Sequence, residues 1–301
     1  MALQSGVIKN GSLVPKNEWI SYISGLENNF DDLETNKERA KRNFSEKFVN
    51  AVKSRAKGRF AVLLSGGVDS ALIALICRQL GCDFQCYTLG IGNSKDGAAA
   101  ERVAMEYGLK LKKITISQDE LETVFLKILK VIGEPDVVKV EVGAVLYVLL
   151  AQVTKDGINN VFGGLGSEEI FAGYQRHEEA LKKGFEALHK ECWSGLKGMW
   201  ERDLVRDSKV SGMFKVNLLT PFLDRDVIVS AMNIHPMYKI DGENKKIILR
   251  EVAEDIGLKH EFAWRKKMAA QYGSNVDDAL ERIARKKGMK KKEFLISSLH
   301  V

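Results

Sequence analysis

Residues 60–77 read Phe60-Ala-Val-Leu-Leu-Ser-Gly-Gly-Val-Asp-Ser-Ala-Leu-Ile-Ala-Leu-Ile-Cys77. The apolar run at its start, the polar centre Ser65–Ser70 and the second apolar run predict a strand, a tight loop and a helix. Glycines allow the loop to approach a ligand closely, and a helix start presents N–H groups and a positive dipole end. The loop therefore predicts a phosphate or pyrophosphate site, with Asp69 as a carboxylate ligand for Mg²⁺. An ordinary strand–turn–helix connection is the alternative.

The composition is that of a soluble globular protein: 301 residues, 45% of them hydrophobic and 29% charged. The first residues lack the layout of a signal peptide, and the apolar stretch 142–153 is too short to span a bilayer. We therefore expect a cytoplasmic protein with no membrane segment. The net charge is +6, and its excess lies in residues 285–292. This basic segment predicts either a solvated helix face or a nucleic-acid surface.

The four cysteines lack the Cys-x-x-Cys spacing that is typical of metal and redox sites. We expect buried thiols, and a sulfur-carrying role in tRNA modification is the alternative. The cysteines are Cys77, Cys82, Cys86 and Cys192.

Strand-like and helix-like segments alternate from residue 57 onward, which predicts an α/β fold with a parallel sheet and helices on both faces. A mainly helical C-terminal part follows, with one extended piece at 216–219. Residues 1–56 predict a helical extension, and residues 57–301 a single catalytic domain. Strands are expected at 60–64, 84–89, 111–116 and 160–163, and helices at 17–56, 70–80, 95–107, 118–132, 136–155 and 167–183.

A second loop, Gly163-Gly-Leu-Gly-Ser-Glu-Glu169, repeats the pattern of the first. Ligands of parallel α/β sheets bind at the carboxyl ends of the strands, where both loops are expected. Asp69 and Glu168 would then face one Mg²⁺, which takes few protein ligands. The alternative is a well-capped helix start with Ser167 as its N-cap.

The first loop resembles the pyrophosphate loop of the N-type ATP pyrophosphatases, or PP-loop superfamily. Four further segments resemble motifs of the asparagine synthetases and occur in that family's order. Residues 58–275 are therefore identified as similar to the C-terminal synthetase domain of that family. The resemblance implies an adenine nucleotide alpha hydrolase-like fold, built on a five-stranded type of parallel sheet. The four segments are 163–174, Thr220-Pro-Phe-Leu-Asp224, Lys246-Ile-Ile-Leu-Arg-Glu251 and Trp264-Arg-Lys-Lys267.

The resemblance implies an ATP- and Mg²⁺-dependent ligase that adenylates a carboxylate, releases pyrophosphate and transfers ammonia or another amine. It implies catalytic roles for Lys267, Lys246 and Glu168, and Mg²⁺ ligation by Asp69 and Glu168. Asp96, at another strand end, is a further candidate for Mg²⁺ or pyrophosphate. The ATP- and pyrophosphate-binding residues implied are Leu64, Ser65, Gly66, Gly67, Asp69, Ser70, Leu89, Gly163, Gly164 and Lys246.

Three residues in or near these segments are expected to have structural roles. Arg250 is expected to pair with a carboxylate, Asp224 to cap the next helix, unless it belongs to the site, and His177 to be a structural histidine.

Two residues depart from the pattern of synthetases that amidate aspartate. Leu165 stands where they carry glutamate, and Glu141 where they carry arginine, which argues against aspartate as the acceptor. Ala2 stands where the family's glutaminase domain would present its cysteine, so ammonia would be free or come from a separate glutaminase subunit. The acceptor and the oligomeric state stay open. The alternative functions are ATP-dependent tRNA modification and a catalytically silent nucleotide-binding subunit.

Overall fold

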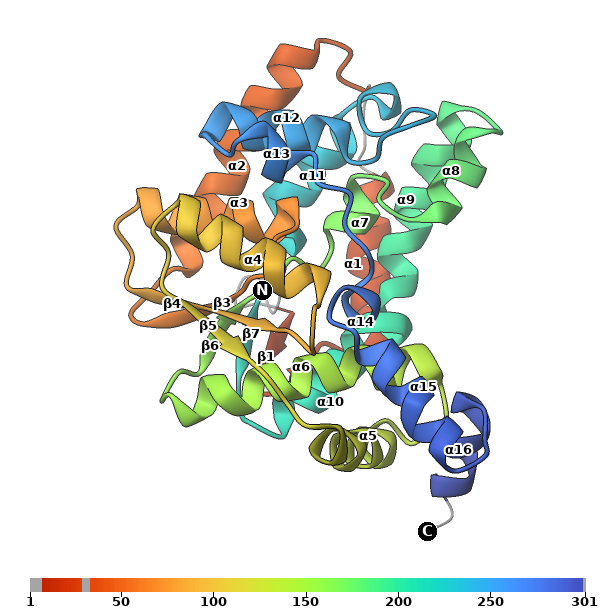
Figure 1. Cartoon of the computed structure of the whole chain (residues 1–301). Coiled ribbons are helices and arrows are strands. Elements are labelled where there is room, and N and C mark those ends of the chain that lie inside the picture. The colour runs from red at the N-terminus through yellow and green to blue at the C-terminus, as the bar shows by residue number, and fades with distance from the viewer. Residues whose placement is uncertain (1–6, 29–32, 300–301) are drawn as a thin grey trace.

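A mostly parallel sheet forms the centre of the protein (Figure 1). The computed structural model describes residues 7–28 and 33–299, and within them the strand order is β2-β1-β7-β6-β3-β4-β5. The five strands from β7 to β5 are all parallel, which confirms the expected five-stranded parallel sheet. The strands are β1 Ile8–Lys9, β2 Ser12–Leu13, β3 Phe60–Leu63, β4 Phe84–Leu89, β5 Leu111–Ile114, β6 Asn160–Phe162 and β7 Asn217–Leu219.

Helices cover both faces of the sheet, as expected for parallel strands joined by crossovers. They are α1 Lys16–Asn28, α2 Lys37–Arg55, α3 Val68–Gln79, α4 Lys95–Glu106, α5 Gln118–Ile132, α6 Val137–Lys155, α7 Ser167–Ile170, α8 Gln175–Leu181, α9 Phe185–Met199, α10 Val205–Gly212, α11 Arg225–Asn233, α12 Ile247–Ile256, α13 His260–Ala263, α14 Ala270–Gly273, α15 Val276–Lys286 and α16 Lys291–Leu299. Two 3₁₀ turns and a π-helical turn complete the described helical segments: η3 Pro221–Leu223, η4 Pro236–Tyr238 and η2 Trp200–Leu204.

The two helical layers differ in what they contribute. On one face α3 and α4 lie on the sheet, with α2 and α12 packed outside α3. On the other face α6 contacts β4 and β5 and is backed by α5 and α10 (Figure 1). The sheet core is aromatic at β3, where the Phe60 ring lies 5.7 Å from Phe84 and 5.1 Å from Phe162. This buried layer fixes β3 beside β6, the strands that lead into the two loops.

Two predicted helices are interrupted. The segment 17–56 forms α1 and α2, and Asn36 caps the second by accepting the Arg39 amide. The segment 167–183 breaks after α7, because Ala172 adopts a left-handed φ of 55° and α8 begins only at Gln175. The break turns the chain back toward the sheet edge and brings Gly173 against Glu168.

An N-terminal hairpin was missed in the helical expectation for residues 1–56. Asn10 and Gly11 both have positive φ, 49° and 77°, as a tight hairpin turn requires, and Asn-Gly is a strong hairpin signal. Ile8 pairs with Leu218, so β1 extends the sheet beyond β7. The boundary between residues 56 and 57 stays a prediction.

Helix α6 is a core helix of the soluble fold. Among the described residues, it alone is long and apolar enough by composition to cross a membrane, but half of that stretch is buried inside the protein. Its neighbours include α5, α10 and α14. The apolar stretch 142–153, which was expected to be too short to span a bilayer, lies within this 19-residue helix, which also includes Lys139 and Glu141.

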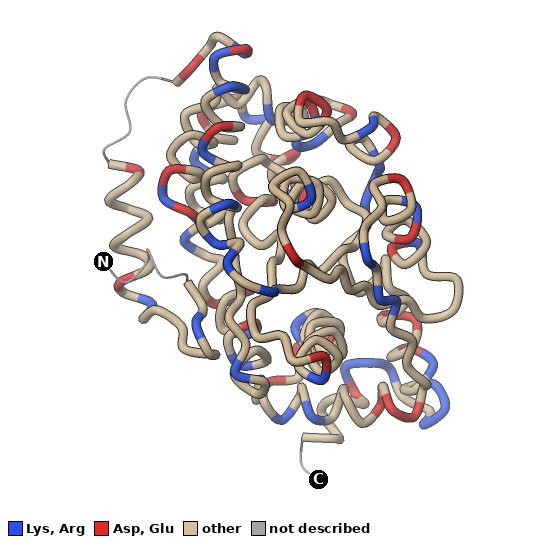
Figure 2. The backbone as a smooth tube through the Cα atoms, turned by 90° about the vertical axis from the view of Figure 1, so that its left-hand side faces the viewer, with Lys and Arg blue, Asp and Glu red and all other residues tan. Residues whose placement is uncertain are grey.

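The basic segment 285–292 lies at the end of α15 and the start of α16. Lys287 pairs with Glu122 at 2.7 Å, and Arg285 pairs with Glu281 at 2.9 Å. Lys291 lies 3.0 Å from Glu141, so part of the excess charge is locally neutralised. Figure 2 shows basic and acidic residues interleaved along much of the chain. These contacts favour a solvated, ion-paired helix face.

Gly198 gives a prediction on stability alone. It is exposed within α9, and a Cβ built there meets nothing within 4 Å. Glycine in a helix is less stable than alanine, so Gly198→Ala is expected to raise the free energy of unfolding by about 0.5–1 kcal/mol. Urea denaturation of both proteins measures the change. A lower free energy of unfolding in the variant would contradict the open environment of this position.

Candidate active site

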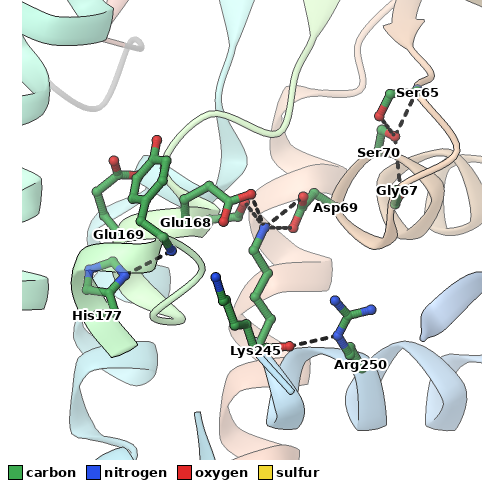
Figure 3. Close-up of polar contacts among 12 residues, drawn as sticks. Ser65, Gly67, Asp69, Ser70, Glu168, Glu169, His177, Lys245 and Arg250 are labelled. Atoms are coloured by element: carbon green, nitrogen blue, oxygen red, sulfur yellow. Dashed lines mark hydrogen bonds and ion pairs between the residues drawn. The ribbon is translucent and has the colours of Figure 1, made fainter. Parts of the chain in front are cut away.

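The first loop joins β3 to α3 at the carboxyl end of the sheet (Figure 3). Ser70 Oγ accepts a hydrogen bond from Ser65 N and donates one to the Gly67 carbonyl, both at 3.2 Å. Gly66 has a φ of +69°, and a Cβ there would lie 2.6 Å from the Ala99 backbone. The Ser70 hydroxyl therefore stabilises the loop by hydrogen bonds to its backbone, and only glycine fits at position 66.

The second loop lies beside the first because β6 pairs with β3. A Cβ on Gly164 would lie 2.9 Å from the Asp69 Cβ, so the two loops are in van der Waals contact. Gly163 has open space around its Cα. Gly166, with a φ of +98°, precedes α7 and packs on Leu223. The structure thus brings the two sequence motifs together at one sheet edge.

Lys246 joins the carboxylates of the two loops. It precedes α12 in a left-handed conformation, with φ 58°, and its side chain is almost fully buried. Its Nζ donates to both Asp69 carboxylate oxygens at 2.9 Å, to Glu168 Oε1 at 2.7 Å and to Ser167 Oγ at 3.1 Å. Asp69 and Glu168 point at this one ammonium (Figure 3).

Burial and neighbouring charges shift the pKa values of Asp69 and Lys246 in opposite directions. Burial alone raises the pKa of Asp69, but the positive charges of Lys246 and Lys267 outweigh it and hold that pKa below its usual value. Burial likewise lowers the pKa of Lys246, and the charges of Asp69 and Glu168 outweigh it and raise that pKa. The site therefore holds a charged Lys246 beside an ionised Asp69.

Lys267 approaches the first loop from the exposed segment between α13 and α14. A Cβ on Gly67 would lie 2.4 Å from Lys267 Cδ, so the lysine stem lies directly over the loop backbone. Leu64 and Leu89 are buried at the ends of β3 and β4 and form an apolar base below the loops. Every residue that the sequence assigned to the nucleotide site lies at or beside this edge.

The oxygen atoms around Lys246 Nζ are suited to a hard cation. Among the described residues no group of three or more His, Cys, Asp or Glu could hold a metal ion. Two carboxylates and the Ser167 hydroxyl nevertheless converge on one point, and Mg²⁺ characteristically takes one or two protein carboxylates together with waters and phosphate oxygens. Asp69 and Glu168 therefore fit Mg²⁺, provided that Lys246 shares or leaves its present position.

The structure corrects two residue expectations. Asp96 is buried, and its Oδ1 accepts a 2.7 Å bond from Arg265, so it is occupied by a protein cation. Arg250 forms no ion pair with a carboxylate of residues 7–28 or 33–299. Its guanidinium donates to the carbonyls of Lys245 at 2.7 Å and Ala263 at 2.5 Å. Sequence reasoning could not supply the partner of Asp96 because Arg265 lies 169 residues away.

The other structural expectations are confirmed. Asp224 caps α11 by accepting the Asp226 amide and pairs with Arg55 at 2.9 Å. His177 is buried, and its Nδ1 accepts the Tyr174 amide at 3.1 Å. Burial lowers the pKa of His177 to about 3, so its ring is neutral near pH 7.

Glu169 anchors a buried charge network that the sequence analysis missed. It is 1% exposed and contacts Arg202 and Arg176, and the Arg176 guanidinium lies 4.1 Å from the Tyr174 ring. Arg202 Nε also forms an ion pair with Asp203 Oδ2 at 2.7 Å, within the π-helical turn η2. Burial raises the pKa of Glu169 to about 7. The adjacent opposite charges in residues 202–207 were the available sequence signal.

The two departures from the aspartate pattern have different surroundings. Leu165 is half-buried and packs against the core. Glu141 is 1% exposed and lies 3.0 Å from Lys291, which also contacts Asp277 at 2.5 Å. The C-terminal helices thus supply a cation to the position where the resemblance implies an arginine.

Glu141 gives a prediction on pH. Burial raises its pKa to about 7, so the folded protein binds this proton more tightly than the unfolded chain, whose pKa is near 4.5. Stability linked to Glu141 is therefore present below pH 4.5 and is lost as the pH rises to 7. Glu141→Gln removes the titrating group. Urea denaturation at several pH values should therefore show the free energy of unfolding of the variant rising relative to that of the wild type between pH 4.5 and 7.

The matched control is Glu122→Gln, which breaks the half-exposed pair with Lys287 against the same C-terminal helices. It should shift stability by a small amount that does not change across the window. A constant offset for Glu141→Gln as well would contradict the proton linkage.

The cysteines are buried, except Cys82, which is half-buried. Burial raises the pKa of all four thiols, to about 12 for Cys86. The thiolate is the nucleophilic form, so these residues are poorly suited to carry sulfur.

Comparison with known proteins assigns this set of motifs to one family. The family model described as asparagine synthase matches residues 43–187 and 181–295. "Putative asparagine synthetase (glutamine-hydrolyzing) 1" of Methanocaldococcus jannaschii is 34% identical over 94% of this chain and 61% of its own length. "Asparagine synthetase B (glutamine-hydrolyzing)" of Escherichia coli is 29% identical over 69% of this chain and 40% of its own length. The chain therefore spans less than two thirds of each of these relatives.

A solved structure, NMN synthetase from Francisella tularensis, aligns with 89% of this chain and 94% of its own at 13% identity and a TM-score of 0.42.

Proposed function

The chain belongs to the asparagine synthase family, and from this we propose that it is an ATP-dependent, AMP- and pyrophosphate-forming ligase that joins a carboxylate to ammonia or another amine. The family consists of ATP-dependent amide-forming enzymes. The observation that carries the proposal is the convergence of Asp69, Glu168 and Lys246 beside the braced first loop. Phosphoryl chemistry needs mainly charge neutralisation and positioning, and this arrangement supplies both.

The first step would form an acyl adenylate. An acceptor carboxylate oxygen attacks the α-phosphorus of ATP, the new O–P bond forms, and the bond from the α-phosphorus to the pyrophosphate oxygen breaks. The Ser65–Ser70 loop and the α3 N-terminus would hold the departing pyrophosphate, and Lys246 would neutralise its charge. Mg²⁺ bound by Asp69 and Glu168 would offset phosphate charge.

The second step would form the amide. The nitrogen lone pair of ammonia or an amine attacks the acyl carbon, the carbon–oxygen bond to AMP breaks, and the nitrogen loses a proton to solvent. Lys267 lies over the first loop and would stabilise the negative charge that develops in either step. AMP leaves with the electron pair of the broken bond.

The acceptor is proposed to be a small carboxylate other than aspartate. Leu165 supports this proposal because it differs from the aspartate-amidating pattern. Glu141 differs as well, but Lys291 places a cation beside it. Ammonia would be free or delivered by a separate glutaminase subunit, and the reaction would take place in the cytoplasm.

A tRNA-modifying activity is the second candidate function, supported by the exposed cations Lys286, Lys290 and Lys292. The high thiol pKa values and the local ion pairs of α15 and α16 weaken it. A silent nucleotide-binding subunit is the third candidate, and it predicts ATP binding without turnover.

The test is pyrophosphate release from ATP and Mg²⁺, with ammonium and a panel of small carboxylates, aspartate included, and with total tRNA in a separate arm. One carboxylate is expected to stimulate release, with equal amounts of AMP. Asp69→Asn should lower release about 100-fold or more, the usual scale for removing a charge-positioning group. Asp83→Asn, in the exposed connection that precedes β4, is the control. Equal release from the wild type and Asp69→Asn would overturn the mechanism, and stimulation by tRNA alone would favour the second candidate.

A further inference from the structure

The segment from Trp264 to Asn275, here called the strap, carries Lys267 across the first loop. It leaves α13, crosses to α14 and includes that short helix, and Figure 1 shows the crossing stretch in blue between the two helices. Residues 266–269 are exposed and belong to no helix or strand. Because this segment has no secondary structure of its own, contacts with other parts of the protein are needed to hold Lys267 over the first loop.

Arg265 provides the central contact. Its guanidinium is largely buried, and it donates to Asp96 Oδ1 at 2.7 Å, to the Lys95 carbonyl at 3.3 Å and to the Ser65 carbonyl at 3.3 Å. One side chain therefore joins the strap to the first loop and to the start of α4. Asp96 also lies against the strap backbone, since a Cβ on Gly273 would lie 2.3 Å from its carboxyl carbon.

Two further contacts hold the strap at its ends. Arg250 donates to the carbonyls of Ala263 and Arg265, which links the start of the strap to the helix that follows Lys246. Asn275 donates to the Ile91 carbonyl at 2.9 Å, and Ile91 N donates to the Ser274 carbonyl at 3.2 Å. Arg265, paired with Asp96, lies two residues from Lys267 in the sequence.

We propose that the Asp96–Arg265 ion pair is a positioning device that holds Lys267 over the pyrophosphate loop, so that Asp96 acts through Arg265 and not as a ligand of metal or phosphate. The proposal rests on the ATP-dependent function given above. A buried carboxylate whose oxygen accepts a charged guanidinium bond makes a strong, directional contact. Its loss would let the strap move and displace the Lys267 ammonium.

The first test is independent of activity. The strap contains Arg265, Lys266 and Lys267, so trypsin can cleave it, and substitutions at Asp96 leave these sites unchanged. Asp96→Ala is expected to increase native-state cleavage in the strap about tenfold with a small change in melting temperature, and Asp96→Asn, which keeps an oxygen acceptor, should have a smaller effect. Glu101 lies on the same helix as Asp96 and forms a half-exposed ion pair with Lys113. Glu101→Gln breaks this pair and should leave cleavage unchanged. Unchanged cleavage in Asp96→Ala would overturn the proposal.

The second test uses pyrophosphate release. Asp96→Ala should lower kcat about tenfold, the scale of a small misplacement, while KM for ATP and the half-saturating Mg²⁺ concentration stay the same. In a Lys267→Met background the substitution at Asp96 should have no further effect on kcat. A raised Mg²⁺ requirement, or the same loss in both backgrounds, would overturn the proposal. A wild type without any release refutes the proposed function instead, and the cleavage test then still decides whether the ion pair holds the strap.

Discussion

Replacing Lys246 with methionine is expected to abolish pyrophosphate release and to lower the free energy of unfolding by about 3 kcal/mol. Methionine fills the space of the lysine stem but leaves Asp69 and Glu168 facing each other without the cation that now binds both. Removing one partner of a buried ion pair typically costs about 3–5 kcal/mol, and the lower figure applies because Glu168 is partly exposed. Urea denaturation and the pyrophosphate assay measure the two effects.

The adjacent residue supplies the control. Lys245 pairs with Glu178 at 2.8 Å, and its side chain is 30% exposed. Lys245→Met should change stability by less than about 1 kcal/mol and leave release intact. Similar losses in both variants would show that the buried position of Lys246 has no special importance.

The pH dependence of the Lys246→Met variant has a definite sign. In the wild type the pKa of Asp69 is lowered, so the stability linked to Asp69 is present above the unfolded pKa near 3.8 and is lost only as the pH falls through the folded pKa. In the variant burial dominates and raises that pKa, so protonation relieves the unpaired charge. The stability difference between the two proteins should therefore shrink as the pH falls from 7 to 5. A constant difference over this range would argue against an ionised Asp69.

Gly173→Ala is expected to remove activity while preserving the fold. A Cβ at this position would lie 1.7 Å from Glu168 Oε2 and 2.6 Å from Lys246 Cε, so both flexible side-chain ends must move. Because these contacts are with side-chain atoms, the backbone fold can be kept, but the movement separates Glu168 from Lys246. A displacement of about 1 Å in such a site costs on the order of 100-fold in rate.

The measurements are kcat for pyrophosphate release and the melting temperature. Gly198→Ala, with open space around it, is the matched substitution and should leave kcat unchanged. A Gly173→Ala enzyme with wild-type activity would mean that the position of Glu168 is unimportant for the reaction.

The sheet was predictable from the sequence for a local reason. Parallel strands are buried on both faces, so β3 is a continuous apolar run and β4 is largely apolar, and their bounds agree with expectation to within one residue. The first loop could be placed because it follows β3 directly, and the second because it follows β6. The break after α7 was not predicted because Ala172 is an ordinary helix former, and its left-handed conformation is imposed by the tertiary structure.

Only part of the candidate site could be predicted from the local sequence. Asp69 and Glu168 follow from strand ends, whereas Lys246 and Lys267 came from the family resemblance, since their local sequence does not distinguish them from surface lysines. Asp96 was misjudged because its partner Arg265 lies 169 residues further along the chain. The Glu169 network likewise joins segments more than 30 residues apart.

The pairing of β1 with β7 has a consequence for the order of events during synthesis. Ile8 is synthesised about 210 residues before its partner Leu218. While the residues between them are being made, the hairpin has no β7 to pair with. Pairings at such long sequence separation form slowly because loop closure precedes any gain. The hairpin can therefore join the sheet only after β7 has been made, and until it does the backbone groups of β7 are open to other strands.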